Sequence, residues 1–420
     1  MRAVIVALTD LGRSPRMQYH AHALAANGVV VDLVGYGGTP VPRRTSNDTR
    51  ITVHRLTPST LRVRQGSGVR YAVLAVIDAA RLSWRLWRIL RKLKGAELVL
   101  VQNPPEFPTL AVTWFSLKAR GVRFVMDWHN LGYTLLQRRV GRWHPAVRLA
   151  RWFERRDATR LDGSLCVSRG LASFIESRFG VKGARVLYDR PASAFVPMDR
   201  SERERFRLAF FGRLGIVGTA AGFIICPSSW TEDEDFDVVI DAVGHLEERI
   251  RGWEAGGAGR RFPHLIILVT GDGARRAEFE RRFAGLAARR VQLRARWLEP
   301  EEYPRVVGSA DLGLCLHRSS SGLDIPMKIA DLFGAGVPVC ALDYGACLAE
   351  RVRHGDNGLL FSTARQLADV LFDLFEGYPA DDAALERLRA GARKAARPTW
   401  EEGWAKEARS VLIPGSPSGV

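Results

Sequence analysis

A polar loop followed by an expected helix start holds the most informative residues of the chain. The loop contains Ser319, Ser320, Ser321, Gly322 and Asp324. Hydroxyl groups and the N–H groups of a flexible backbone bind anions when they lie at the positive end of a helix. The apolar residues 312–316 predict a strand before this loop, and Pro326 suits a first helical position after it. The segment therefore predicts a phosphate-binding turn.

Two charged residues follow on the same predicted helix. Lys328 and Asp331 are three positions apart, so they share one helix face. A lysine ammonium suits a phosphate, and a carboxylate suits the hydroxyl groups of a ribose. The whole segment therefore predicts a nucleoside-diphosphate site. The alternative is a solvated surface loop with an exposed Lys328–Asp331 pair.

Other polar segments also follow predicted strands. Residues 10–20 carry one glycine and two arginines, which fit either an anion site or a basic turn. In residues 127–133, His129 is a candidate acid–base or substrate contact, or else a satisfied structural histidine. Gly271 belongs to a glycine turn that is a weaker phosphate candidate. The acidic run 232–235 fits a solvated helix start or a carboxylate that faces a cleft.

The elements that must position these loops form two sets of apolar stretches separated by helical segments. The stretches are 3–8, 29–34, 98–101, 124–126 and 165–167, then 223–226, 265–269, 312–316 and 337–342. This alternation predicts two doubly wound α/β domains with parallel sheets, whose ligands bind beyond the carboxyl ends of the strands. We expect an N-terminal domain over 1–197, a linker at 198–207, a C-terminal domain over 208–395 and a terminal helix and tail over 396–420 that can pack back on the N-terminal domain.

Composition limits the class of protein. A chain of 420 residues with 46% hydrophobic residues predicts two globular domains. The five cysteines lack CxxC spacing and indicate buried thiols in a reducing compartment. The net charge of +17 indicates an anionic partner such as nucleic acid, a membrane surface or a phosphorylated substrate. No signal peptide and no apolar stretch of about 18 residues is visible, so we expect any membrane association to be peripheral.

Six segments in order resemble the chitobiosyldiphosphodolichol β-mannosyltransferase family. They are residues 12–20, 102–105, 127–130, 188–191, 229–236 and 319–328, and they span most of the chain. The resemblance implies a GT-B glycosyltransferase with two Rossmann-like domains that face a cleft. It implies transfer of mannose from GDP-mannose to GlcNAc2-diphosphate-dolichol at the cytosolic face of the endoplasmic reticulum. The chain departs from the family at Glu106-Phe107, in residues 206–221, and in the absence of an N-terminal spanning helix before its first strand.

The resemblance also assigns roles. A β linkage formed from an α-linked sugar nucleotide requires inversion, and the base that accepts the acceptor proton is either His129 or Glu234. The donor residues are Ser319, Ser320, Ser321, Gly322, Lys328 and Gly271, with Asp331 at the ribose and Asp324 at the mannose. The residues expected to bind the acceptor and its diphosphate are Gly12, Arg13, Ser14, Arg16, Tyr19, His20, Asn103 and Asn130. We expect no metal ligands and no tightly bound cofactor, and dependence on a divalent metal stays open.

The expected partners are the dolichol-linked oligosaccharide, a membrane surface and, as a further candidate, other mannosyltransferases of the pathway. Residues 69–94 predict a helix with an apolar face, a basic stripe at Arg81, Arg85, Arg88 and Lys92, and two tryptophans on its flank. We expect this helix to lie on the membrane, although a core-facing helix with solvated arginines has the same pattern. The alternatives for function are another GT-B enzyme or a non-catalytic, basic nucleic-acid-binding protein. No nucleic-acid partner is expected, because no aromatic stacking platform is visible, and no G-x-G-x-x-G supports a dinucleotide oxidoreductase.

Overall fold

The computed structural model describes residues 1–57, 69–104, 108–117, 121–216, 221–257, 261–286, 288–413 and 415. The chain divides into two compact units. Unit 1 comprises Met1–Tyr188 and Glu401–Val420, and unit 2 comprises Asp189–Trp400. The departing pair at 106 and 107 lies outside the described residues.

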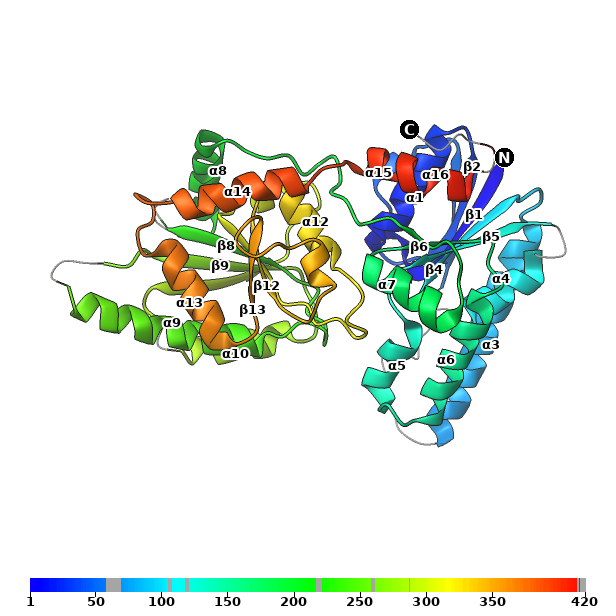
Figure 1. Cartoon of the computed structure of the whole chain (residues 1–420), viewed down its shortest axis with the longest axis horizontal. Helices are drawn as coiled ribbons and strands as arrows, with labels where there is room; N and C mark the ends of the chain where they lie inside the picture. The colour runs from blue at the N-terminus through cyan, green and yellow to red at the C-terminus, as the bar shows by residue number, and fades with distance from the viewer. Residues whose placement is uncertain are drawn as a thin grey trace. The chain divides into compact units, whose positions relative to one another are not determined.

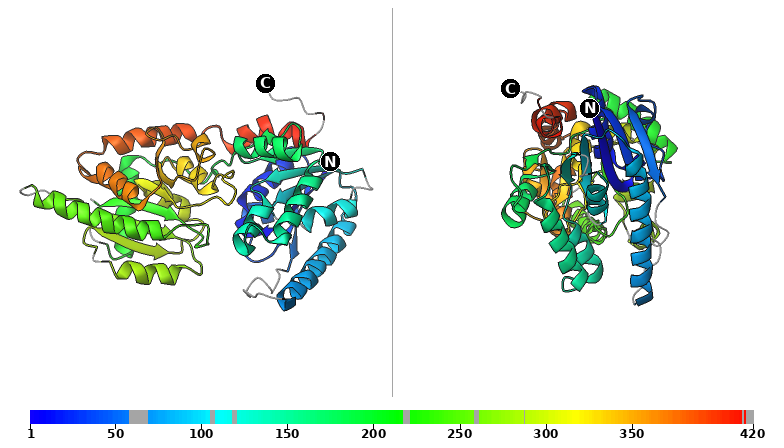
Figure 2. Two further views of the ribbon diagram at one scale, coloured as in Figure 1. Left: turned by 60° about the horizontal axis from the view of Figure 1, so that its bottom comes forward. Right: turned by 90° about the vertical axis from the view of Figure 1, so that its right-hand side faces the viewer.

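Unit 1 is a parallel α/β domain (Figure 1 and Figure 2). Over the described residues it has a seven-stranded sheet in the order β3-β2-β1-β4-β5-β6-β7. The strands are β1 (Arg2–Asp10), β2 (Val30–Tyr36), β3 (Ile51–Leu56), β4 (Leu98–Asn103), β5 (Arg123–Trp128), β6 (Gly163–Cys166) and β7 (Arg185–Val186). The helices are η1 (Leu11–Arg13), α1 (Pro15–Ala26), α2 (Arg43–Ser46), α3 (Val69–Lys92), α4 (Thr109–Leu117), α5 (Gly132–Val140), α6 (Pro145–Ala158), α7 (Arg169–Phe174), η4 (Ile175–Phe179), α15 (Trp400–Glu407) and α16 (Arg409–Leu412).

The strand order of the unit 1 sheet reverses between the neighbouring strands β1 and β4. From β1 the chain adds β2 and β3 towards one edge of the sheet, and from β4 it adds β5, β6 and β7 towards the other edge. Figure 1 shows α3, α4 and α6 on the side of the sheet away from α1 and α15. This strand order creates a crevice at the carboxyl ends of β1 and β4, where such sheets bind ligands.

Unit 2 has the same plan with a shorter sheet. Over the described residues its order is β10-β9-β8-β11-β12-β13, again parallel. The strands are β8 (Gly222–Pro227), β9 (Leu265–Thr270), β10 (Val291–Arg296), β11 (Leu312–Cys315), β12 (Val339–Leu342) and β13 (Gly358–Phe361). The helices are α8 (Arg200–Arg213), α9 (Asp237–Ala255), α10 (Arg276–Ala284), α11 (Tyr303–Ser309), α12 (Met327–Gly334), η5 (Leu348–Glu350), α13 (Ala364–Phe375) and α14 (Ala383–Ala395). Its crevice lies between the ends of β8 and β11.

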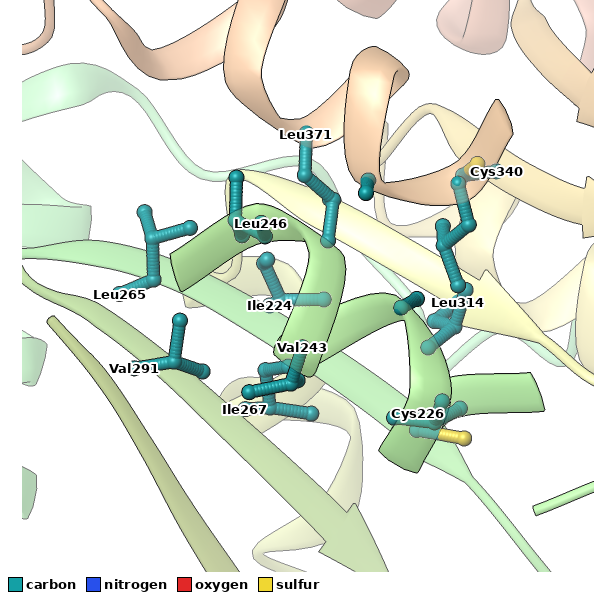
Figure 3. Packing of buried hydrophobic residues seen from close by; sticks show 14 of the residues in the cluster. Ile224, Cys226, Val243, Leu246, Leu265, Ile267, Val291, Leu314, Cys340 and Leu371 are labelled. Atoms are coloured by element: carbon teal, nitrogen blue, oxygen red, sulfur yellow. The ribbon is translucent and has the colours of Figure 1, made fainter. Parts of the chain in front are cut away.

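The core of unit 2 fills the space between its sheet and two helices (Figure 3). Ile224 and Leu314 from the strands, Leu246 from α9 and Leu371 from α13 belong to one buried cluster. Each is at most 1% exposed. Complete burial of such a side chain stabilises the fold by about 1.5–3 kcal/mol. The sheet of unit 2 is thereby fixed, and its strand ends hold the loops that follow.

The predicted linker differs from the structure. Residues 198–207 mostly belong to α8, whose start is fixed by a reciprocal cap: Glu202 N–H donates to Asp199 at 2.8 Å, and Asp199 N–H donates to Glu202 at 2.9 Å. Buried Arg207 anchors the helix by donating to Ser309 O and Asp311 Oδ1, both at 2.6 Å. The charges that suggested a solvated linker therefore serve a cap and a buried ion pair.

Candidate functional site

The loops after β8 and β11 meet at the crevice of unit 2. Glu234 and His317 form an isolated antiparallel bridge between these loops. Arg318 N–H donates to Asp233 O at 2.7 Å, and Asp235 N–H donates to Leu316 O at 3.1 Å. The acidic run therefore packs against the neighbouring loop, and α9 begins after it at Asp237.

Glu234 and Lys328 form a charged pair at this crevice. Glu234 is 2% exposed, and its carboxylate accepts bonds from Ser228 Oγ at 2.8 Å, from Ser229 N at 3.0 Å and from the Lys328 ammonium. Burial alone would lower the pKa of Lys328, but the nearby Glu234 carboxylate raises it. The lysine is therefore charged at neutral pH, and any bound phosphate shares it with Glu234.

His317 is a member of the site that the sequence analysis missed. Its Nδ1 lies 3.0 Å from Asp233 Oδ2, and its Nε2 lies 2.9 Å from Asp324 Oδ2. Burial opposes the charged imidazolium, but the bonds to these two carboxylates raise the pKa of His317 to about 9. The imidazolium holds the two loops together. Its position directly after a predicted strand was the available signal, the same one that singled out His129.

The serine loop is folded onto Asp324. The hydroxyl of Ser319 donates to Asp324 Oδ1 and accepts Gly322 N–H at 2.8 Å. Ser321 Oγ accepts Leu323 N–H at 3.1 Å. These bonds, together with the His317 contact, hold the Asp324 carboxylate in place, so a contact with the donor sugar stays a prediction. Ser320 is half-buried in the same loop.

Lys328 and Asp331 both lie on α12, which begins at Met327, one residue later than predicted. Burial and the charge of Asp189 together raise the pKa of Asp331 to about 8, against an opposing effect of Lys328. At neutral pH this carboxyl is therefore protonated. A neutral carboxyl both donates and accepts hydrogen bonds, which changes the predicted acceptor-only contact with a ribose.

Gly271 packs closely against the loop that follows β8. It has φ +93°, and a Cβ at this position would lie 2.0 Å from Ser228 O. The loop that it touches contains Trp230, which has φ 54° and stacks on Phe236 at 4.5 Å between ring centroids. A side chain at position 271 would displace this loop, which carries Glu234. The close approach explains the glycine, and a phosphate contact stays a prediction.

The crevice of unit 1 contains a buried carboxylate with three partners. Asp127, at the end of β5, accepts bonds from Arg16 Nε at 2.7 Å and Arg16 Nη2 at 2.8 Å, and from the Nε2 atoms of His129 at 2.8 Å and His20 at 3.2 Å. Burial would raise the pKa of Asp127, but Arg16 and His129 together hold it well below its usual range. The ionised Asp127 fixes the His129 ring. In the neutral imidazole with Nε2–H, the lone pair is on Nδ1.

Arg16 and His20 are buried beneath this crevice. Arg16 is 1% exposed and also donates to Leu187 O at 2.8 Å. His20 accepts from Trp404 Nε1 at 3.1 Å, and burial lowers its pKa. A direct contact of these two side chains with the acceptor diphosphate would require these bonds to open. Arg13 is exposed and His129 is partly exposed, so both are accessible to a ligand.

The remaining predicted acceptor residues surround the same strand ends. Gly12 packs so closely on the next loop that a Cβ would lie 2.5 Å from Thr39 O. The Ser14 hydroxyl is 3.4 Å from Gln102 Oε1, and Tyr19 is half-buried. These contacts bring the loops after β1 and β2 together with the end of β4.

Asn103 connects the crevice to α6. Its Nδ2 donates to Glu154 Oε1 at 2.7 Å and to Asn130 O at 3.1 Å. Burial raises the pKa of Glu154, although Asn103 and the N–H groups of Gly132 and Tyr133 favour its ionised form. Among the residues that the structure describes, Asn103 Oδ1 is buried without a hydrogen-bond partner. Asn103, Asn130 and His129 therefore lie together, as the strand order requires.

Comparisons with known proteins agree with this architecture. Residues 12–189 match the glycosyl transferase 4-like domain, and residues 223–376 match glycosyl transferases group 1. Among solved structures, sucrose-phosphate synthase of Thermosynechococcus elongatus has a TM-score of 0.67 at 15% identity, covering 96% of both chains. HepE of Anabaena, solved with UDP and glucose, has a TM-score of 0.64 at 15% identity, covering 94% of both chains. The two doubly wound units define a GT-B glycosyltransferase.

Curated relatives narrow the assignment. Chitobiosyldiphosphodolichol beta-mannosyltransferase of mouse is 37% identical over 96% of this chain and 87% of its own length. The Yarrowia lipolytica enzyme of that name is 38% identical over 96% of this chain and 85% of its own length. UDP-glycosyltransferase TURAN of Arabidopsis thaliana is 36% identical over 98% of this chain and 97% of its own length. The chain belongs to the chitobiosyldiphosphodolichol β-mannosyltransferase family, which confirms the resemblance found in the sequence.

Proposed function

We propose that this enzyme transfers mannose from GDP-mannose to the chitobiose of a dolichol-linked diphosphate and forms a β-1,4 linkage. The observation that carries the proposal is the similarity, over almost the whole chain, to relatives named for this transfer. The charged crevice of unit 2 supports it, because departure of a nucleoside diphosphate requires a cation near the leaving oxygen. Lys328 supplies this cation.

The donor residues follow from the same crevice. Lys328 binds the diphosphate, and its bond to Glu234 keeps it oriented until the donor arrives. Ser320, Gly322 and the N-terminus of α12 supply further donors to phosphate oxygens. Protonated Asp331 binds the ribose, and Asp324 lies at the sugar. His317 keeps the loop that carries Asp324 in place.

His129 is the preferred base of the inverting reaction. Its Nδ1 takes the proton from the acceptor hydroxyl while the hydroxyl oxygen attacks the anomeric carbon of mannose. The bond from that carbon to the diphosphate oxygen breaks, and GDP leaves with the electron pair. Asp127, fixed by Arg16, stabilises the imidazolium that forms. Glu234 remains the alternative, but its ion pair with Lys328 favours a part in donor binding.

The lipid-linked acceptor requires contact with a bilayer, which we assign to the cytosolic face of the endoplasmic reticulum. None of the helices in the described parts of the chain is long and apolar enough to cross a membrane. Helix α3 supports peripheral contact in a different way from the prediction. In its second half the helix packs inward through Leu86 and Leu90, both 0% exposed, whereas Trp84 is 55% and Trp87 is 39% exposed. In its first half Val76 is 69% exposed. The exposed tryptophans and arginines of α3 form the membrane contact.

The decisive experiment offers purified enzyme a chitobiosyl-diphosphate isoprenoid together with labelled GDP-mannose, UDP-glucose or UDP-N-acetylglucosamine. We expect transfer from GDP-mannose and a product that β-mannosidase cleaves. The relative named UDP-glycosyltransferase makes a UDP-sugar donor the second candidate. Transfer from a UDP-sugar and none from GDP-mannose would refute the proposal. The same assay with and without a chelator measures dependence on a divalent metal.

A further inference from the structure

An apolar cavity opens between α4 and α6 of unit 1. Its volume is about 300 Å³. Its walls are formed by Leu110, Ala111, Trp114 and Phe115 of α4 and by Phe153 of α6. This volume is within the range of pockets that hold small apolar ligands. No residue of the proposed chemistry uses this cavity.

The rim of the cavity is cationic. Arg156 and Arg160 both line it, and they share one buried carboxylate, Asp157, at 2.6 Å and 3.6 Å. Two guanidinium groups with one carboxylate leave a net positive charge. Arg156 also lies over the Phe153 ring, with its central carbon 4.9 Å from the ring centroid. The site therefore combines apolar walls with a positive edge, which suits a hydrocarbon chain that begins at an anionic group.

Helix α6 connects the wall of the cavity to the acceptor-side crevice through two hydrogen bonds. Phe153, in the wall, precedes Glu154, which binds Asn103 at 2.7 Å. The backbone O of Asn103 accepts His129 N–H at 2.9 Å. Helix α6 therefore contributes both to the cavity and to the acceptor-side crevice of unit 1.

We propose that this cavity binds the first isoprene units of the lipid-linked acceptor, with Arg156 and Arg160 at the diphosphate end of the chain. The inference rests on the proposed function and adds a subsite to it. The occupant is a single branched hydrocarbon chain held outside the bilayer, and not the bilayer surface itself. Phe115, which is 85% exposed, covers the outer end of the chain.

Two variants and a matched control test the cavity. Ala111→Trp fills it, and Phe115→Ser removes an exposed wall at little risk to folding. Trp143→Ser removes another aromatic of unit 1, 80% exposed and outside the cavity. With an isoprenoid-linked chitobiosyl diphosphate, the first two variants should raise KM about tenfold, because losing roughly two buried methylene groups costs that much affinity. With a chitobiosyl diphosphate that carries a methyl group in place of the isoprenoid, all three should match the wild type.

The outcomes separate the subsite from its alternatives. Unchanged KM for the isoprenoid acceptor in both cavity variants, or an equal rise for the two acceptors, would overturn the inference. Parallel losses of vesicle binding in Phe115→Ser and Trp143→Ser would also overturn it, in favour of a bilayer contact. A wild-type enzyme that transfers no mannose would instead refute the proposed function. In that case a photoreactive isoprenyl diphosphate should still label the segment 110–115, and labelling elsewhere would refute the subsite independently.

Discussion

At the scale of single residues, the crevice of unit 2 depends on one partly buried ion pair. Lys328 is held by Glu234, so a donor diphosphate must interact with a lysine whose position is already fixed. We expect Lys328→Ala to weaken GDP-mannose binding by about 1.5–3 kcal/mol, the contribution of a charge-assisted bond. Titration calorimetry with GDP measures it. Lys182→Ala, at an exposed position of unit 1, is the control and should bind like the wild type. Equal affinity of the two variants would refute the donor assignment.

The two candidate bases differ in their partners, which makes them distinguishable. His129 has an ionised carboxylate behind its ring, whereas Glu234 is bonded to the donor-side lysine. We expect His129→Ala to lower kcat by roughly 100-fold or more, the usual loss of a general base, with little effect on donor affinity. We expect Glu234→Gln to raise the KM for the donor more than it lowers kcat. The reverse result in steady-state kinetics would make Glu234 the base.

His317 should make the stability of unit 2 depend on pH. Its pKa is raised to about 9 from a usual value of 6.5, so its contribution is complete below pH 6.5 and is lost as pH rises through about 9. One pKa unit corresponds to about 1.4 kcal/mol, so the effect amounts to a few kcal/mol. His317→Gln cannot titrate. We expect the gap in urea midpoint between wild type and this variant to shrink from pH 6.5 to pH 9.5. A constant gap would show that the His317 ring is not charged in the folded protein.

At the scale of elements, the strands that carry the sites are the ones the sequence reveals most clearly. The apolar runs of β1, β4, β5, β8 and β11 are buried on both faces, and each was predicted because central parallel strands have continuous apolar sequences. The edge strands β3, β7, β10 and β13 were missed. Buried and more exposed residues are mixed in them, as in Ile51–Leu56 and Val291–Arg296, so polar side chains interrupt the apolar pattern.

Sequence patterns predicted the candidate sites less completely than the strands. The Lys328–Asp331 helix and the His129 loop were found because their residues are adjacent in sequence. The partners were not found, because they come from distant segments: Arg16 lies 111 positions from Asp127, and Lys328 lies 94 positions from Glu234. Protonation was not predictable either, since the raised pKa of Asp331 depends on burial and on Asp189. Tertiary burial and pairing, rather than local pattern, define the chemical state of each group.

Helix α3 presents its arginines and tryptophans together. The central guanidinium carbon of Arg88 lies 5.4 Å from the centroid of Trp84, and that of Arg91 lies 4.8 Å from Trp87. Such a surface combines interfacial aromatic rings with attraction of roughly 1 kcal/mol per charge near anionic lipid. We expect replacement of Arg81, Arg85 and Arg88 by glutamine to reduce flotation with anionic vesicles, with the difference fading at high salt.

A matched triple variant of unit 2 controls for the change in net charge. Arg261, Arg365 and Arg387 are exposed, and their replacement by glutamine removes the same three charges. This variant should float almost like the wild type, because the lost charges lie outside α3. If both triple variants lose vesicle binding equally, the overall charge of +17 and not α3 governs association.

At the scale of the whole molecule, the chain leaves unit 1 after Tyr188 and returns to it at Glu401. The returning segment completes the buried cluster of unit 1. Trp404 is 2% exposed and donates to His20, which in turn bonds to Asp127. On α16, Val411 packs against β6, since a Cβ on Gly163 would lie 2.9 Å from its side chain. The end of the chain therefore supports the residues beneath the candidate base.

This arrangement predicts that Trp404 stabilises unit 1 and positions its active residues. Trp404→Ala should destabilise unit 1 by about 3–5 kcal/mol, the usual cost of deleting a buried large aromatic side chain. Trp404→Phe keeps most of the packing but leaves His20 Nδ1 without its donor, at a cost of about 1–3 kcal/mol. Amide exchange in α1 measures both effects, and exchange in α9 of unit 2 should stay unchanged. Trp297→Ala, at a position 49% exposed, is the control and should change exchange in neither helix. If Trp404→Ala exchanges like this control, the returning segment is not part of the fold of unit 1, and the support that it gives to Asp127 and His129 is refuted with it.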